Sequence, residues 1–479
     1  MEMLFESRSE INELDGKLRP VQQRPEVTAQ PVLEPDNVGD GAGCSIYGSV
    51  LHDGGVYRMW YQGWPRDWDG RNSAIVCYAE SDDGVTWHKP ELHLDDRFEA
   101  PNNVTDLGMH APSVFIDPEA PPSHRYRAAG AAGKSYAGAH PDVTSQSYYT
   151  AHSADGLHWT LDEPSPTWSG SDVITSVYHP EQHCGRVALK RNVRAGGIRR
   201  RAIWNADLVD GRWQPASCAL VPDAFDDTSA LARGFASGDY YGMGMQPAGT
   251  GTAGFIWQFR HSLPRTAKNA SAGDGPGVFG VVDVSLAYQP DAHSAWLHSH
   301  SRQDFISSAD IPWLPHGCIY TAAAPAAFGD EHRLYLCATP AHGWYIDADW
   351  SVIEQAKAKV IQRGLSRIGY ARWPAYRLFG YRAEPEGVVT LNIGRITEPM
   401  TLYLNFETHN ADGSVKVAVK GHEARTSEFC VPLRGDTIAA EVSWRDEGSA
   451  IPANTAKNTV IELHLTEATL WAWDLRVTK

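Results

Sequence analysis

Side chains that can exchange protons recur at or just before the starts of apolar, strand-like segments of this chain. Asp and His act as general acids or bases, and a Tyr hydroxyl donates a proton to a nearby atom. If the segments converge, these groups form a site for acid–base chemistry; the alternative is that some of them cap strands or bond neighbouring backbone. The candidates for direct chemistry are Asp40, Tyr47, His110, Asp172, Asp239 and His316.

A second set of polar and aromatic residues lies in longer loops or beside those starts. Binding residues usually concentrate on loops held by a rigid scaffold, and aromatic rings give flat surfaces for sugar rings. We therefore expect substrate contacts from Trp64, Asp67, Arg191, Arg194, Tyr241, Tyr320, His342 and Trp344.

The segment Lys190–Arg201 holds six cations in twelve residues of a chain with a formal net charge of −16. One interpretation is a solvated hairpin. The other is recognition of a carboxylate or sulfate on a substrate, because Arg binds such oxyanions with two parallel hydrogen bonds.

A repeat supplies the elements that must position these residues. Each copy ends in a strand, a tight turn that is Asp-Gly in the clearest copies, and a Trp, and each is preceded by two apolar strands. Turns of this kind at intervals of 54–83 residues are typical of propeller blades of about four strands. The copies are Tyr78–Trp87, Thr150–Trp159, Trp204–Trp213, Leu286–Trp296 and Ile368–Trp373.

The sequence thus predicts an all-β protein, a five-bladed β-propeller followed by a C-terminal β-sandwich domain, with a sixth blade as the alternative count. We expect an N-terminal arm packed along the propeller over residues 1–30, the propeller over 31–380 and the sandwich over 381–479. One helix is expected at Val352–Gln362. In a propeller the innermost strands line a central channel, so the candidates for chemistry should meet at one end of it, and the Asp-Gly turns should lie at the other.

Composition narrows the classes of partner. The net charge of −16 argues against a general nucleic-acid binder, and no apolar run approaches the length of a membrane span. The seven Cys include no CxxC pair, which favours buried free thiols over disulfides or a zinc site. The N-terminus lacks the pattern of a signal peptide, so we expect a cytoplasmic protein, or a secreted one if a leader has been removed.

Four segments together resemble the five-bladed propeller proteins related to glycoside hydrolase families 32, 43 and 68, in particular a bacterial branch that ends in a β-sandwich. They are Tyr57–Tyr61, Tyr78–Trp87, Asp117-Pro with Arg125-Tyr-Arg, and Asp239–Met243. The resemblance implies furanosidase-type activity on arabinose, xylose or fructose units, with three acidic residues on the first three inner strands. This chain departs from that pattern: Tyr47-Gly-Ser-Val and Ala111-Pro-Ser-Val stand where an arabinosidase has Asp-Pro-Ser-Val, and Glu-Gly-Pro is missing. Asp172, two residues before the expected place on the third strand, is the substitute.

Three functions are compatible with these residues. The first is a glycoside hydrolase with Asp172 and Asp239 as acid/base pair, Asp40 assisting, and His110 and His316 orienting the sugar. The second is a polysaccharide lyase in which His and Tyr residues act on a uronate and the Arg-rich loop neutralises its carboxylate. The third is a non-catalytic sugar-binding protein. The expected partner is an oligosaccharide or glycoside, neutral or acidic; no cofactor is predicted, and a channel-bound metal held by His and Asp is left open.

Overall fold

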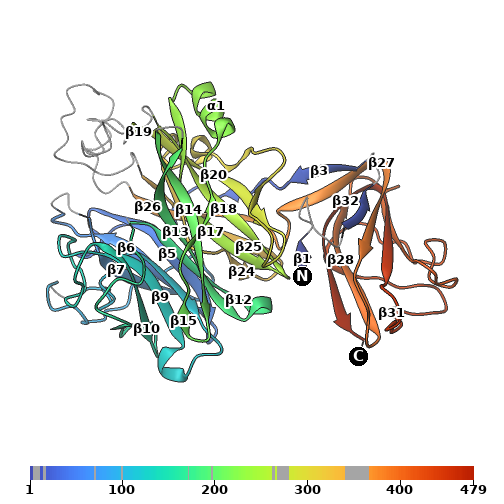
Figure 1. Ribbon diagram of the computed structural model, residues 1–479, viewed down its shortest axis with the longest axis horizontal. Coiled ribbons are helices and arrows are strands. Elements are labelled where there is room, and N and C mark those ends of the chain that lie inside the picture. Colours follow the sequence, from blue (N-terminus) through green and yellow to red (C-terminus); the bar gives the residue numbers. More distant parts are fainter. Residues whose placement is uncertain are drawn as a thin grey trace.

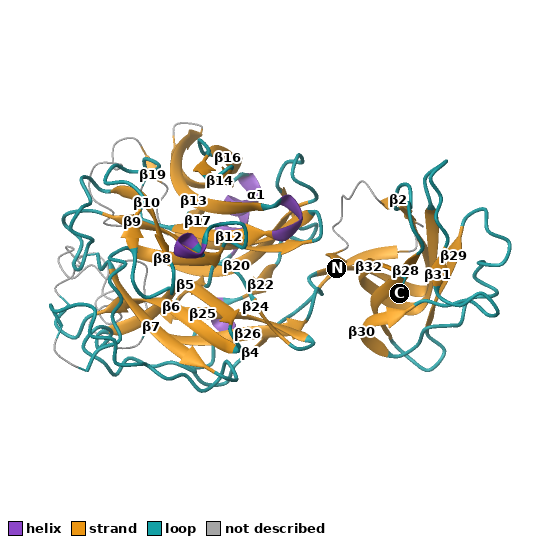
Figure 2. Cartoon of the chain, turned by 90° about the horizontal axis from the view of Figure 1, so that it is seen from below, coloured by secondary structure: helices purple, strands orange, loops and turns teal. Residues whose placement is uncertain are grey.

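The computed structural model describes residues 1–3, 11–14, 18–68, 72–98, 101–170, 172–195, 198–261, 265–266, 280–339 and 366–478. These residues are almost all in β-strands and connecting loops, with one α-helix among them, α1 (Ala224–Ala232) (Figure 2). The expected all-β class is confirmed. The expected helix at 352–362 lies outside the described residues.

The larger body of the protein consists of antiparallel sheets that follow one another along the chain (Figure 1). The first has the order β5-β6-β7 and the second β8-β9-β10-β11. The third has β12-β13-β14-β15, with β16 and β19 also on β14. Their bounds are β5 (Gly43–Asp53), β6 (Val56–Trp64), β7 (Ile75–Ser81), β8 (His110–Ile116), β9 (Tyr126–Ala132), β10 (Ser147–Ser153), β11 (Thr160–Leu161), β12 (Ile174–His179), β13 (Cys184–Ala195), β14 (Ile198–Val209), β15 (Arg212–Trp213), β16 (Ser217–Leu220) and β19 (Arg265–Thr266).

The last two groups of strands in the body are joined into one ten-stranded sheet, because Val282 and Cys318 pair in parallel between them. The first group is β17-β18-β20 and the second β23-β25-β26, with β4 pairing β26 at the far edge. Their bounds are β17 (Ser237–Ala248), β18 (Gly251–His261), β20 (Gly280–Gln289), β21 (Leu297–His298), β22 (Asp304–Ile306), β23 (Cys318–Thr321), β24 (Ala326–Phe328), β25 (Glu331–Thr339), β26 (Arg367–Pro374) and β4 (Glu26–Val27).

The first strands of these five groups are linked to one another in a closed ring. Each link is a hydrogen bond of 2.5–2.9 Å that joins a side chain or backbone group to the next first strand or the residues just after it. The links are Val114 to Ser49, Ser176 to Ser113, Thr175 to Met243, Met245 to Ala323, and Ala323 to Gly48. Residues at equivalent places on β5, β8, β12, β17 and β23 therefore surround one axis.

The remaining strands form a C-terminal unit with its own hydrophobic core. Its nine-stranded sheet has the order β2-β27-β32-β28-β30, with β1, β3, β29 and β31 attached. The bounds are β1 (Glu2–Met3), β2 (Ile11–Leu14), β3 (Leu18–Gln22), β27 (Phe379–Asn392), β28 (Met400–Thr408), β29 (Ser414–Val419), β30 (Asp436–Glu441), β31 (Ala450–Ile451) and β32 (Val460–Val477).

The N-terminal segment differs from the expected arm along the larger body. β1 pairs with β32, and β2 and β3 pair with β27, so this segment completes the C-terminal sheet (Figure 1). Among the described N-terminal strands, β4 is the one that pairs with the larger body. The physical reason is that a strand edge with unpaired N–H and C=O groups takes up any extended segment of suitable length, whatever its place in the sequence.

The Asp-Gly turns have the structural role that the repeat predicts. Asp83 accepts the N–H groups of Val85 and Thr86 at 2.7 and 2.8 Å, and these hydrogen bonds lower its pKa to about 2. The next turn is joined to the preceding sheet, since Trp60 Nε1 donates to Gly156 O at 2.7 Å. Six of the seven Cys are buried thiols, as expected, and Cys218 is exposed.

We predict that Asp83→Ala lowers the free energy of unfolding by about 1 kcal/mol, the net value of a few turn hydrogen bonds. The folded pKa of Asp83 lies below its ordinary 3.8, so the stabilisation from the ionised carboxylate is complete above pH 3.8 and is lost as pH falls towards 2. Thermal unfolding at several pH values measures this difference. Asp82→Ala removes an exposed carboxylate from the same turn and is the control; equal effects of the two variants would contradict the assignment.

Candidate functional site

Three of the ring strands carry an irregularity at equivalent places. The pairing register shifts between Ser45 and Ser49 in β5, between His110 and Ser113 in β8, and between Tyr240 and Met243 in β17. Such bulges turn a side chain out of its regular direction and are frequent beside active sites. The side chains within or beside them are Tyr47, His110 and Tyr241.

Glycine or a left-handed residue makes each of these bulges sterically accessible. A Cβ on Gly48 would lie 1.8 Å from the carbonyl oxygen of Trp60, and one on Gly242 would lie 2.4 Å from the Trp257 ring. In β8 the equivalent place is taken by Ala111, whose φ is +53°. Strain of this kind persists only where surrounding structure enforces it, and here the Ala111 N–H donates to Gln62 Oε1 at 3.1 Å.

The bulged side chains meet in an aromatic cluster at the axis. The Tyr47 ring centroid lies 5.6 Å from His110, 5.8 Å from Trp257 and 4.7 Å from Tyr320. Tyr47 and Tyr320 are also hydrogen-bonded to each other, and Tyr320 lies 5.4 Å from Tyr241. Burial raises the pKa of Tyr47 and Tyr320 well above the ordinary value, so both hydroxyls remain protonated.

His110 is held as a neutral imidazole with a defined tautomer. Its Nδ1 lies 2.7 Å from the Ser73 carbonyl oxygen, which only accepts, so Nδ1 carries the proton and Nε2 the lone pair. Burial lowers the pKa of His110 below its ordinary value, and the nearby Asp172 charge opposes that shift. The ring is therefore a proton acceptor at neutral pH.

Asp172 is the carboxylate of this cluster. Lys190 Nζ lies 2.5 Å from its Oδ1, and the Tyr241 hydroxyl donates to Oδ2 at 3.2 Å. The Lys190 side chain is buried and its ammonium lies 3.8 Å from the centre of the Tyr241 ring, while the Asp172 side chain keeps 23% of its surface exposed. The Tyr148 hydroxyl fixes the backbone beneath, at 2.9 and 2.7 Å from the carbonyl oxygens of Val173 and Lys190.

Asp239 lies in a different environment from the one expected of a catalytic acid. It is buried and contacts Arg200 Nε at 3.1 Å, Arg201 Nη1 at 3.0 Å and His261 Nε2 at 3.2 Å. Burial alone raises its pKa, but the hydrogen bond with His261 and the two guanidinium charges outweigh burial and hold the pKa well below the usual range. A carboxylate that stays ionised cannot donate a proton, so Asp239 cannot be the acid of the expected pair with Asp172, and the pair stays a prediction with Asp239 as its base.

Asp40 is likewise committed to structural contacts. It is fully buried and accepts from Lys89 Nζ at 2.7 Å and from the Tyr61 hydroxyl at 2.8 Å. The N–H groups of Asp36 and Asn37 donate to its other oxygen at 3.1 and 2.9 Å. These four donors fix the loop before β5, and the assisting role expected for Asp40 does not fit.

The other expected residues are distributed around the cluster and beyond it. Trp64 is buried, donates to Ser45 Oγ at 3.2 Å and lies 6.1 Å from the His110 ring. Arg191 donates to Ser169 O at 2.8 Å and covers the Trp204 ring at 5.1 Å. Asp67, Arg194 and His316 are exposed, and His316 has a left-handed backbone with φ of +64°. His342 and Trp344 lie outside the described residues.

Sequence reasoning missed the role of Lys190, Arg201, Trp257 and Gln62. Arg201 lies between Asp239 and the aromatic cluster, with its guanidinium 5.8 Å from the Tyr241 ring. The available signal was the recurrence of Tyr-Gly, at Tyr47-Gly48 and Tyr241-Gly242, which marks the bulges. No comparable signal identifies which cation of a basic run faces the axis.

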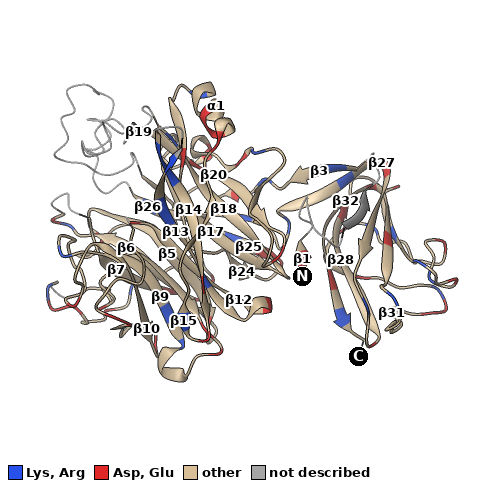
Figure 3. Cartoon of the chain, in the orientation of Figure 1, with Lys and Arg blue, Asp and Glu red and all other residues tan. Residues whose placement is uncertain are grey.

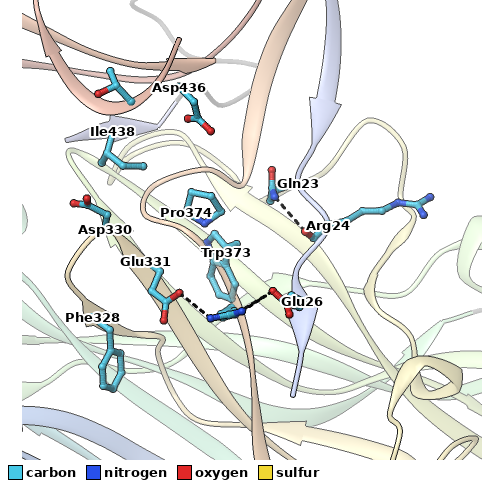
Figure 4. A pocket seen from close by; sticks show the side chains of 12 residues that line it. Gln23, Arg24, Glu26, Phe328, Asp330, Glu331, Trp373, Pro374, Asp436 and Ile438 are labelled. Carbon is cyan, nitrogen blue, oxygen red and sulfur yellow. Dashed lines mark hydrogen bonds and ion pairs between the residues drawn. The ribbon is translucent and has the colours of Figure 1, made fainter. Parts of the chain in front are cut away.

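A cavity of about 790 Å³ lies elsewhere, between the larger body and the C-terminal unit (Figure 4). Arg372 lines it on the side of the larger body, with ion pairs to Glu26 at 2.9 Å and Glu331 at 3.7 Å, and Asp436 lines it on the side of the C-terminal unit. Within the described ranges, no group of three or more His, Cys, Asp or Glu side chains could hold a metal ion. No helix in those ranges is long and apolar enough to cross a membrane.

Comparison with known proteins finds remote similarities to solved structures. The chain matches no protein-family model and no curated protein sequence. It is similar to a thermostable family-43 glycoside hydrolase, at 11% identity over 69% of this chain and 88% of that one, with a TM-score of 0.43.

Two further solved structures cover more of the chain. An exo-β-1,3-galactanase from Phanerochaete chrysosporium, in complex with β-1,3-galactotriose, is 12% identical over 92% of this chain and all of that one, with a TM-score of 0.39. A fructofuranosidase from Schwanniomyces occidentalis, complexed with fructosylnystose, is 10% identical over 93% and 97%, with a TM-score of 0.41. With TM-scores below 0.5, these likenesses assign neither family nor activity.

We predict that Asp239→Asn destabilises the fold by about 3–5 kcal/mol, because the buried Arg201 guanidinium loses its carboxylate and Arg200 keeps only Asp227. Asp67→Asn changes an exposed carboxylate and should stay within about 0.5 kcal/mol of wild type. The midpoints of urea unfolding measure both. Wild-type stability of Asp239→Asn together with lost turnover would instead identify Asp239 as a catalytic residue.

Proposed function

We propose that this protein is a five-bladed β-propeller with a C-terminal β-sandwich, and that it cleaves a glycosidic bond at one mouth of the propeller channel. The blades are the five strand groups whose first strands form the hydrogen-bonded ring, over residues 31–380, and the sandwich is the unit over 381–479 together with the N-terminal strands β1, β2 and β3. The observation that carries the activity is the meeting of Asp172, Lys190, His110 and Tyr47 at the axis of that ring.

Hydrolysis is the first candidate reaction. His110 accepts a proton from water through Nε2, and ionised Asp172 stabilises the positive charge that develops on the sugar ring in the transition state. The proton donor for the leaving oxygen is the Tyr47 hydroxyl, which is hydrogen-bonded to the hydroxyl of Tyr320. This assignment replaces the expected pair of carboxylates with one carboxylate and one imidazole.

Elimination is the second candidate, and the neutral state of His110 favours it. A polysaccharide lyase needs a base for the C5 proton of a uronate, a proton donor for the leaving oxygen, and a cation beside the uronate carboxylate. His110, Tyr47 and the Lys190–Arg201 segment supply groups of these three kinds. Ultraviolet absorbance of an unsaturated product separates this reaction from hydrolysis.

We predict that Asp172→Asn lowers turnover by about 10²–10³-fold, the usual contribution of one group that stabilises charge in the transition state. The substrates are a panel of neutral furanosides and uronate-containing oligosaccharides, followed by reducing ends and ultraviolet absorbance in the same samples. Asp82→Asn, in a turn of the opposite rim, is the control and keeps wild-type rates. Unchanged turnover of Asp172→Asn on a substrate that the wild type cleaves would remove Asp172 from the mechanism.

The pH profile tests His110 separately. The base must be neutral, and burial holds its pKa below the ordinary 6.5, so kcat/KM should stay level down to pH 6.5 and fall only at lower pH. His110→Gln should remove that acidic limb along with most of the activity. A limb that persists in His110→Gln with the same midpoint belongs to another group and contradicts the assignment.

A further inference from the structure

The hairpin of β13 and β14 carries an unusual concentration of like charge. Residues 187–206 include six Lys and Arg and no Asp or Glu, in a protein whose net charge is −16. Figure 3 shows these cations gathered along β13 and β14, close to β19.

The pairing register places these cations in a defined order. Lys190, Asn192 and Arg194 alternate along β13 and so share one face of the sheet. Their partners on β14 are Ile203, Arg201 and Arg199, respectively. The face that presents Lys190 to Asp172 at the channel axis therefore continues past Arg201 to Arg194 and Arg199.

Arg194 and Arg199 lie directly opposite each other on adjacent strands. Like charges in this position repel and destabilise a sheet. An anion that lies across two opposed arginines offsets their repulsion and so stabilises the sheet. Each guanidinium can donate two parallel hydrogen bonds to a carboxylate or sulfate.

The inner cations of the hairpin already have carboxylate partners. Lys190 is paired with Asp172, Arg201 with Asp239, and Arg200 with both Asp227 and Asp239. Arg194, at the outer end, is exposed. The exposed positive charge therefore lies on the same face of the sheet as Lys190, at the end that is farther from Asp172.

We propose that the substrate is an anionic saccharide whose carboxylate or sulfate group is bound by Arg194 and Arg199. This inference rests on the proposed cleavage at Asp172. Arg194 lies four positions after Lys190 along the strand, about 13 Å at the usual rise per residue. The anionic group is remote from the cleaved bond, so these arginines govern binding more than chemistry.

The test measures binding and turnover with matched probes. The probes are oligogalacturonate against its methyl ester, and a sulfated galactan oligosaccharide against its desulfated form. Dissociation constants come from titration calorimetry on full-length Asp172→Asn, at low and high salt. We expect at least one acidic probe to bind about tenfold or more tightly than its neutral counterpart, with a difference that shrinks at high salt.

The double variant Arg194→Gln/Arg199→Gln should abolish that difference and, in the enzyme with Asp172 intact, raise KM about tenfold or more with kcat little changed. The control Arg445→Gln/Lys457→Gln removes two exposed cations from the C-terminal unit and should change neither. The pair of probes that shows the preference identifies the anionic group as a uronate carboxylate or as a sulfate.

Equal binding of acidic and neutral probes, or no binding of any acidic probe, would overturn the inference. A preference that survives in Arg194→Gln/Arg199→Gln would also overturn it. Tight, arginine-dependent binding of an acidic probe that the wild type never cleaves would support the anion site and count against the proposed function, so the two failures are distinguishable.

Discussion

The closed ring of hydrogen bonds between the first strands is the constraint on which the rest of the structure depends. Each first strand is tied to the next by a polar side chain or a backbone group, from Ser49 round to Gly48. Because all five strands face one axis, any side chain that a bulge directs inward meets the side chains of the others. The bulges of β5, β8 and β17 thus convert a repeated architecture into one asymmetric site.

Electrostatics divides the charged groups around the axis into two classes. Asp239 and Asp40 are sealed among donors and cations, so they hold strands and loops in place. Asp172 has a cation partner as well but keeps access to solvent, and His110 remains neutral beside it. A carboxylate and an imidazole in these states suit charge stabilisation and proton acceptance, respectively.

Much of this arrangement was predictable from the sequence, and the reason is periodicity. The repeated turns predicted strand groups in series, and the strand starts predicted that eight side chains would converge. Tyr47, His110, Asp172, Tyr241 and Tyr320 do come together, whereas Asp40 and Asp239 have structural partners and His316 is exposed. The fate of Asp239 was not predictable, because it depends on Arg200, Arg201 and His261, which reach it only through strand pairing. The pairing of β1, β2 and β3 with the C-terminal sheet was not predictable either, because a strand at the edge of a sheet has little sequence pattern of its own.

The most direct test of the account is a crystal structure of Asp172→Asn soaked with an oligosaccharide that the wild type cleaves. The account predicts a sugar chain at the mouth of the ring, with the cleaved linkage beside residue 172 and within hydrogen-bond reach of His110 Nε2. Sugar bound instead in the cavity beside Arg372, or on the C-terminal unit, with the channel mouth empty, would contradict it.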